Sequence, residues 1–155
     1  MRRKDREVTD HHEILHIIDA CKIIRICMSD KEGLYLVPLN FGYEYKNNQF
    51  IFYCHSAKEG RKLDAISSNP SIGFEMDCQH RLIEAKKACN YSFSFQSVIG
   101  NGTAVIINEN EEKKHGLTLL MKHQTGKDFS FHDSMIENIA VIKITVSSLS
   151  AKRHL

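Results

Sequence analysis

The sequence is poor in the features that mark secreted, membrane and zinc-binding proteins. It has five cysteines, an odd number, and no two of them form a Cys-x-x-Cys pair. This pattern argues against a disulfide framework and against a zinc site, and it is typical of a reducing cytoplasm. No apolar run approaches the length of a membrane span, and no apolar segment follows the basic opening Met1–Lys4 as a signal peptide requires. We therefore expect a cytoplasmic protein with neither a membrane anchor nor a metal site.

Charge and length narrow the class of protein further. A formal net charge of +2 is too small to indicate a nucleic-acid partner. A chain of 155 residues fits one domain, residues 1–155, and can bury roughly two-thirds of its unfolded surface. We expect one globular domain without a nucleic-acid partner.

The order of hydrophobic patterns predicts a fold that is mainly β with helices, of the α+β class. Strands are expected at residues 22–28, 34–45, 50–55, 71–77, 93–107 and 139–146. Helices are expected after the capping pair Asp10 and Glu13, after a short turn at His55 and Ser56, and over residues 110–123. The second of these helices is expected to hold Lys58, Arg61 and Lys62 in its first turns. Residues 79–92 are expected to form a long loop or a short irregular helix, and residues 151–154 a short basic tail. Six strands joined largely by hairpins predict a closed or nearly closed antiparallel barrel with helices at its ends.

Two strands have compositions that bear on barrel closure and on a ligand. The 93–107 strand places Gly100, Gly102 and Ala104 on one face, and small residues there permit the sharp coiling that closure needs. The 34–45 strand contains Pro38, which cannot donate to a ladder and so marks an edge, a bulge or a break. Either a flat ligand meets the backbone at this point, or the proline protects an edge strand against aggregation.

Three cations follow the 50–55 strand: Lys58, Arg61 and Lys62. The turn between this strand and the cations carries His55 and Ser56. A helix that begins here presents unpaired N–H groups, and nearby cations add charges suited to a phosphate. The alternative is that these residues form the solvated face of an amphipathic helix. No Ser-His-Asp order, metal-ligand spacing or pair of spaced carboxylates stands out. The pattern therefore favours a phosphate-bearing aromatic cofactor that carries the chemistry.

Three segments in order resemble one family: Val37–Tyr43, Tyr53–Lys62 and Ser97–Gly102. They are similar to the flavin-binding split-barrel family, which includes pyridoxamine 5′-phosphate oxidase, and most of all to its 5-nitroimidazole-resistance (Nim) branch. The opening Met-Arg-Arg-Lys-Asp-Arg-Glu and the closing Lys-Arg also resemble that branch, so the similarity spans nearly the whole chain. The resemblance implies a six-stranded antiparallel split β-barrel of Greek-key type. It also implies FMN, with FAD as the alternative, bound between the two subunits of a homodimer.

The resemblance assigns roles to particular side chains. Arg61 and Lys62 match phosphate-binding positions, and Ser97 matches a polar position near the flavin ring and its ribityl chain. His55 matches a histidine near the reactive face, where it would donate a proton, orient the substrate, or merely cap a carbonyl. Gln96 departs from the pattern, because many relatives have arginine there. The cofactor-binding residues expected on these grounds are Val37, Pro38, Leu39, Asn40, Tyr53, His55, Ser56, Lys58, Arg61, Lys62, Ser97 and Val98.

The function expected is that of a flavin-dependent oxidoreductase that reduces nitroaromatic compounds such as 5-nitroimidazoles to amines. Pyridoxamine 5′-phosphate oxidation is a rival reaction. It needs further basic residues for the phosphate of the substrate, and only Lys152 and Arg153 are candidates. A protein that binds flavin or haem without turnover, as a carrier or redox sensor, is the alternative from another class.

Overall fold

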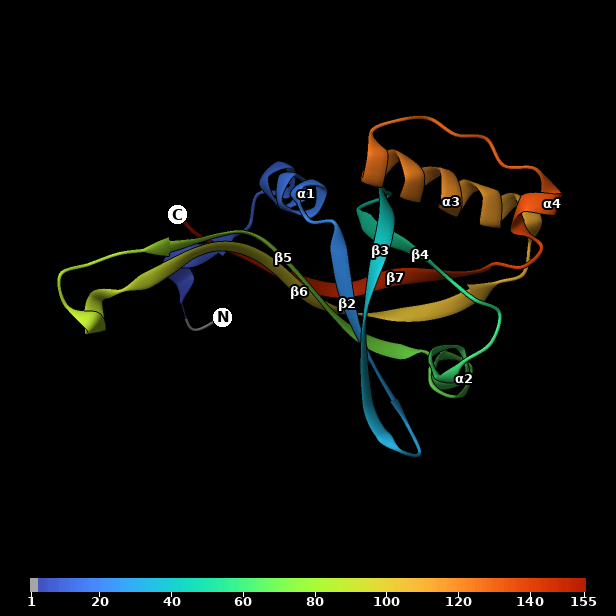
Figure 1. The fold of residues 1–155 in the computed structure, drawn as a ribbon, viewed down its shortest axis with the longest axis horizontal. Helices are drawn as coiled ribbons and strands as arrows, with labels where there is room; N and C mark the ends of the chain where they lie inside the picture. The colour runs from blue at the N-terminus through green and yellow to red at the C-terminus, as the bar shows by residue number, and fades with distance from the viewer. Residues whose placement is uncertain (1–2) are drawn as a thin grey trace.

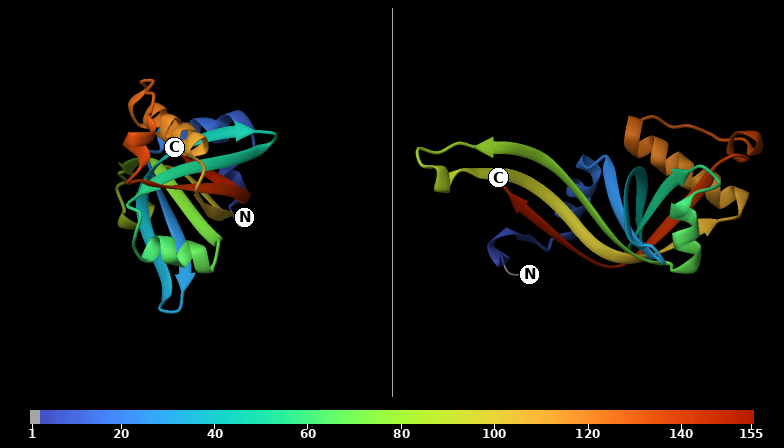
Figure 2. Two further views of the ribbon diagram at one scale, coloured as in Figure 1. Left: turned by 90° about the vertical axis from the view of Figure 1, so that its right-hand side faces the viewer. Right: turned by 60° about the horizontal axis from the view of Figure 1, so that its bottom comes forward.

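Six long strands form a ring that closes on itself (Figures 1 and 2). A computed structural model describes residues 3–155, so Met1 and Arg2 of the basic opening lie outside the described residues. Neighbours pair antiparallel in the order β7-β4-β3-β2-β5-β6, and a β6–β7 ladder completes the ring. This confirms the predicted six-stranded antiparallel barrel. The strands are β1 (Glu7–Val8), β2 (Ile23–Asp30), β3 (Gly33–Lys46), β4 (Gln49–Ser56), β5 (Ser71–Ile83), β6 (Ser92–Ile107) and β7 (Ala140–His154).

Helices cover the ring from two directions (Figure 1). They are α1 (His11–Ala20), α2 (Arg61–Ser68), α3 (Asn110–Thr125) and α4 (Asp133–Ile136), with 3₁₀ turns at Lys4–Arg6 and Ala88–Asn90. The predicted cap of α1 is confirmed, because the Asp10 carboxylate accepts a hydrogen bond from the Glu13 N–H at 3.0 Å. None of the helices in residues 3–155 has both the length and the apolar character needed to cross a membrane.

Glycines on the inner face of β6 let β7 approach closely, as the small-residue pattern predicted. A Cβ added to Gly100 would lie 2.3 Å from the Ser148 carbonyl oxygen, and one on Gly102 would lie 2.6 Å from that of Thr145. The β6–β7 register shifts between Asn101 and Gly102. Absent side chains and a register shift are the two devices that let a sheet coil tightly enough to close.

Two predictions about chain ends and loops were wrong. Residues Gln79–Ile83 do not begin a loop: they continue β5, which with β6 forms an arm that projects beyond the ring (Figures 1 and 2). A bulge near Gln79, whose φ is 57°, shifts the register and breaks the alternation that would have indicated a strand. Residues Ala151–His154 are not a tail but the end of β7, paired with β6 as far as Phe95. In both places the backbone ladder extends the strand beyond the residues whose alternation indicates it.

One histidine joins three elements. The buried His123 ring in α3 places Nδ1 2.8 Å from the Phe41 carbonyl oxygen of β3 and Nε2 3.1 Å from that of Asp19 in α1. Carbonyl oxygens only accept, so both bonds form when each ring nitrogen carries a hydrogen. His123 therefore holds the ends of two helices against the barrel.

Replacing His123 by alanine is expected to lower the free energy of unfolding by roughly 2–4 kcal/mol, because two buried hydrogen bonds are lost and a gap remains. Urea unfolding followed by circular dichroism measures this. The exposed His12 is the matched control, and His12→Ala is expected to leave the midpoint unchanged. Equal midpoints for the two variants would show that the His123 contacts contribute nothing.

Candidate functional site

The barrel splits between β3 and β4. Their ladder ends at the pair Phe41 and Cys54, immediately before Asn40 and His55. From there the first half of β3 follows β2, whereas the end of β4 follows β7 (Figure 1). The other side of residues 33–40 pairs with no strand in the part of the chain that is described. Pro38 thus lies on a free edge, which is one of the alternatives predicted for it.

The four residues of β3 that were predicted to contact the flavin ring, Val37–Asn40, lie on two different faces of the strand. Val37 and Leu39 are half-buried against the core, whereas Pro38 and Asn40 are exposed. The Asn40 amide already donates to the Lys22 carbonyl and to the Gln124 side chain, each at 3.1 Å. The Asn40 side chain is therefore engaged with α3 and with the residue before β2, which leaves the unpaired backbone edge and the exposed Pro38 ring to meet a ligand.

His55 and Ser56 lie at the end of β4, on the opposite side of the split. His55 is exposed, and its imidazole has no hydrogen-bond partner within residues 3–155, so it caps no carbonyl there. Ser56 is half-buried and pairs with Ala140 of β7. Both ring nitrogens of His55 are available to a molecule in the split.

Tyr53 and Val98 are predicted cofactor contacts whose side chains point into the protein. Tyr53 is buried beneath α3, and its hydroxyl donates to Glu44 at 2.8 Å. Burial, with the Glu44 carboxylate nearby, raises the pKa of the Tyr53 phenol. Val98 is fully buried in the core. Neither side chain reaches the split, so a contact with a cofactor there would have to use the backbone.

Ser97 and Gln96 lie on β6, away from the split. Ser97 pairs with Asp77 of β5 and Lys152 of β7, and β5 and β2 separate it from β3. One chain therefore does not bring Ser97 against the split. Gln96 is 9% exposed and faces inward, accepting from the Cys78 thiol at 3.9 Å. An arginine at this position would be buried, so its absence removes no cation from the outer face of β6.

The predicted cations do not form a single cluster. Arg61 binds the β2–β3 hairpin: its Nε lies 2.7 Å from Asp30 Oδ2, and its guanidinium lies 4.6 Å from the centre of the Tyr35 ring. The hydrogen bond from Arg61 lowers the pKa of Asp30. Lys62 is half-buried and has no acidic partner among the described residues. Of the adjacent pair, Lys62 is the cation that is free.

The start of α2 suits an anion. Gly60 precedes it with φ of 130°, a conformation that favours glycine, and no side chain of the described chain caps the helix. The N–H groups of Leu63 and Asp64 donate to the Gly60 carbonyl, so the open donors of the first turn are the N–H groups of Arg61 and Lys62, beside the Lys62 side chain and the Ser56–Lys58 turn. This donor set fits a phosphate group.

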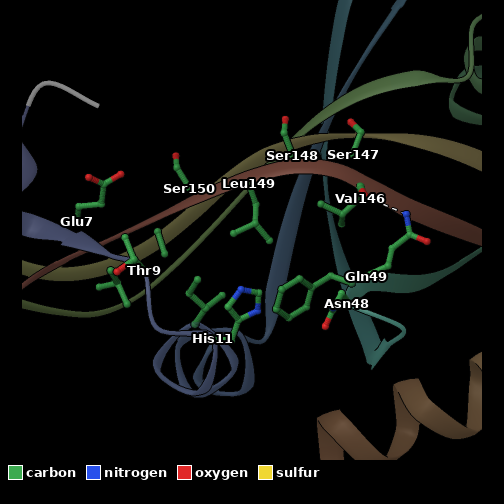
Figure 3. Close-up of a pocket in the computed structure, with 14 residues that line it drawn as sticks. Glu7, Thr9, His11, Asn48, Gln49, Val146, Ser147, Ser148, Leu149 and Ser150 are labelled. Atoms are coloured by element: carbon green, nitrogen blue, oxygen red, sulfur yellow. Dashed lines mark hydrogen bonds between the residues drawn. The ribbon is translucent and has the colours of Figure 1, made fainter.

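A cavity of about 350 Å³ lies at the far end of β4, between α1 and β7 (Figure 3). His11 extends into this region from the first turn of α1 toward Leu149, and its Nδ1 lies 2.7 Å from the Tyr45 hydroxyl. Among the described residues, Glu7 is the one that lines the cavity with a carboxylate, and no lysine or arginine lines it. Its chemistry does not fit a phosphate.

The sequence reasoning missed an ion-pair network on the outer face of the barrel. Arg25 Nη1 lies 2.9 Å from Glu75 Oε2 and 2.6 Å from Asp77 Oδ1. The i, i+2 spacing of the two acids on a strand places them on one face, where they can share one cation.

A ring of six antiparallel strands that splits beside a basic turn defines the class of split-barrel proteins. The chain belongs to the pyridoxamine 5′-phosphate oxidase family, whose profile matches residues 10–153. No curated protein sequence matches it.

Solved structures agree with this fold. A candidate 5-nitroimidazole antibiotic resistance protein from Bacteroides thetaiotaomicron is 31% identical with a TM-score of 0.81, over 95% of this chain and 86% of that one. The flavocytochrome Anf3 from Azotobacter vinelandii is 20% identical with a TM-score of 0.80, over 100% and 72%. A FAD- and haem-binding protein from Mycobacterium smegmatis is 14% identical with a TM-score of 0.79, over 96% and 73%. The last two likenesses establish the fold alone.

Proposed function

We propose that the chain is a flavin-dependent oxidoreductase that reduces nitroaromatic compounds such as 5-nitroimidazoles. The observation that carries this proposal is the uncapped start of α2, with a free Lys62, beside a split whose β3 edge is unpaired. Membership of the family supports it, and so does the 31% identity to a candidate 5-nitroimidazole resistance protein.

Each part of the site has a task that its chemistry suits. Lys62, Arg61 and the N–H groups of α2 would hold the phosphate, and the backbone edge at 37–40 would lie along the flavin ring. When bound, the flavin supplies the two-electron chemistry. His55, with both nitrogens free, would orient the nitro compound or deliver a proton to it. Arg61 would have to exchange or share its Asp30 contact in order to reach the phosphate.

Pyridoxamine 5′-phosphate oxidation is less well supported by the placement of the remaining cations. Lys152 and Arg153 lie in the β6–β7 ladder, and Arg153 is bound by Glu13 at 3.0 Å. Arg153 is therefore not free to hold a second phosphate, and within one chain Lys152 lies next to Ser97, away from the split, which favours a substrate without one.

The activity is tested with anaerobically reduced protein. Addition of one equivalent of a 5-nitroimidazole per three reduced flavins is expected to reoxidise the protein and to yield the amine, because this six-electron reduction takes three electron pairs. Absorbance measures the reoxidation, and mass spectrometry identifies the amine. His55→Ala is expected to slow reoxidation roughly 10²-fold or more with flavin content unchanged, whereas the exposed His16→Ala leaves the rate unchanged. Reduced protein that no nitro compound reoxidises would instead point to a carrier.

We also propose a homodimer in which each subunit completes the site of the other. The outer face of β3, β2 and β5–β6 exposes three apolar side chains: Leu34 (81%), Leu36 (58%) and Ile99 (50%). Large apolar side chains gathered on one exposed face are typical of an interaction surface. Ser97 lies on β6 at the same parity as Ile99, so a second copy packed on this face could present it to the split.

Leu36→Glu is expected to convert the dimer to monomers, because it replaces an exposed apolar side chain of this face by a carboxylate. Flavin is expected to be lost with it. Light scattering coupled to size exclusion measures the mass. Met135→Glu in α4, at an equally exposed position (55%), is expected to leave the dimer intact. A wild-type protein that is monomeric with full flavin content would contradict the shared site.

A further inference from the structure

A second cavity adjoins the candidate flavin site. Its volume is about 390 Å³, within the range of small-molecule pockets. Ala140 lines the cavity and is the cross-strand partner of Ser56, so one wall of the cavity lies next to the end of β4. Its walls come from α2, the β6–α3 connection, α3 and the start of β7: Lys58, Leu63, Asp64, Ser67, Ile106, Ile107, Asn108, Lys113, Ile139 and Ala140.

The cavity combines an apolar floor with two cations. Leu63, Ile107 and Ala140 are each at most 6% exposed and form its buried surface. Neither Lys58 nor Lys113 has a carboxylate within ion-pair distance in residues 3–155. The lining contains one carboxylate, Asp64, so two positive charges face one negative charge.

Other cavities offer different chemistry. The one beside Arg61 is lined by three carboxylates, Asp30, Glu32 and Asp64. Arg61 there is already ion-paired with Asp30, and the cavity of Figure 3 has no cation from lysine or arginine. The cavity beside Arg61 also contains Lys31, but its three carboxylates outnumber the two cations. Unpaired ammonium groups in excess over carboxylates attract an anion, and an apolar floor suits a flat aromatic base.

We propose that this cavity binds an adenosine monophosphate group, with its phosphate between Lys58 and Lys113 and its base against the apolar floor. The position rests on the proposed function, because the cavity continues from the turn that would hold the flavin phosphate. The group can arrive as the adenylate half of FAD or as free AMP. The chain then selects FAD over FMN, and Lys113 is a binding residue that no local motif indicates.

The test compares FMN, FAD and AMP on flavin-free protein by fluorescence and calorimetry. Wild-type protein is expected to bind FAD at least tenfold more tightly than FMN, and to bind AMP. Lys113→Ala is expected to weaken FAD and AMP roughly tenfold with FMN unchanged, since one charge-assisted bond is lost. Lys113→Arg, which keeps the charge, is expected to restore most of the FAD affinity. An unchanged melting temperature checks that Lys113→Ala still folds.

The outcomes separate this inference from the flavin proposal. AMP binding that depends on Lys113, in a protein that binds no flavin, supports the cavity and contradicts the proposed function. Equal affinities for FMN and FAD, with no binding of AMP, overturn the cavity assignment and leave the flavin proposal standing. A loss of FMN and FAD to the same extent in Lys113→Ala also overturns it, because Lys113 would then serve the shared flavin phosphate.

Discussion

Protein in which Arg61 and Lys62 are both replaced by alanine is expected to purify without flavin. Lys62 is the free cation at the start of α2, and Arg61 is the adjacent one that can turn from Asp30 to a phosphate. Charge-assisted hydrogen bonds to a phosphate are the strong ones in such a site, and losing two weakens binding roughly 10²–10⁴-fold. Absorbance of the purified protein and titration with flavin measure the loss.

The control for this variant removes the same charge elsewhere. Lys86 and Lys87 lie exposed beyond β5 on the projecting arm, and their double alanine variant is expected to keep its flavin. Loss of the exposed Arg61–Asp30 ion pair costs little stability, so the site variant is expected to stay folded by circular dichroism. Full yellow colour in Arg61→Ala/Lys62→Ala would show that the phosphate is held elsewhere.

Gly42→Ala is expected to lower the free energy of unfolding by about 3 kcal/mol. A Cβ at Gly42 would lie 2.2 Å from the Leu120 backbone nitrogen and 2.4 Å from the Leu119 carbonyl carbon. Backbone atoms cannot turn aside as a side chain can, so α3 must move away from β3. The His123 contacts, which depend on that packing, would be lost with it.

A glycine in an open position provides the comparison. A Cβ at Gly73 of β5 would have its nearest neighbour 3.8 Å away, an ordinary contact. Gly73→Ala is expected to be neutral or to stabilise by up to about 1 kcal/mol, because alanine loses less conformational freedom in a strand. Urea midpoints that fall together for the two variants would contradict the close packing of α3 on Gly42.

Local chemistry explains the parts of the fold that could be predicted. Asp10 and Glu13 define a helix start within four residues, and Asn47 and Asn48 adopt the positive φ values of a tight hairpin turn. That turn sets the register of β3 against β4. The order of residues along the chain therefore suffices to predict Pro38, Asn40 and His55 at one end of the pair.

The features of the fold and site that could not be predicted from the sequence depend on contacts between residues that lie far apart along the chain. The arm strands and the end of β7 have few buried apolar side chains, and the ladder with their neighbours sets their conformation. The ion pair of Arg61 with Asp30 joins positions thirty-one residues apart, and the cavity joins Lys58 to Lys113. No local pattern encodes which cation is occupied and which is free.

The most direct measurement is mass spectrometry of the cofactor released from protein purified without added flavin, together with its absorbance spectrum. A yellow protein that releases one flavin per chain is the predicted result. A colourless protein that takes up neither FMN nor FAD would contradict the account, since the open start of α2 would then hold no flavin phosphate.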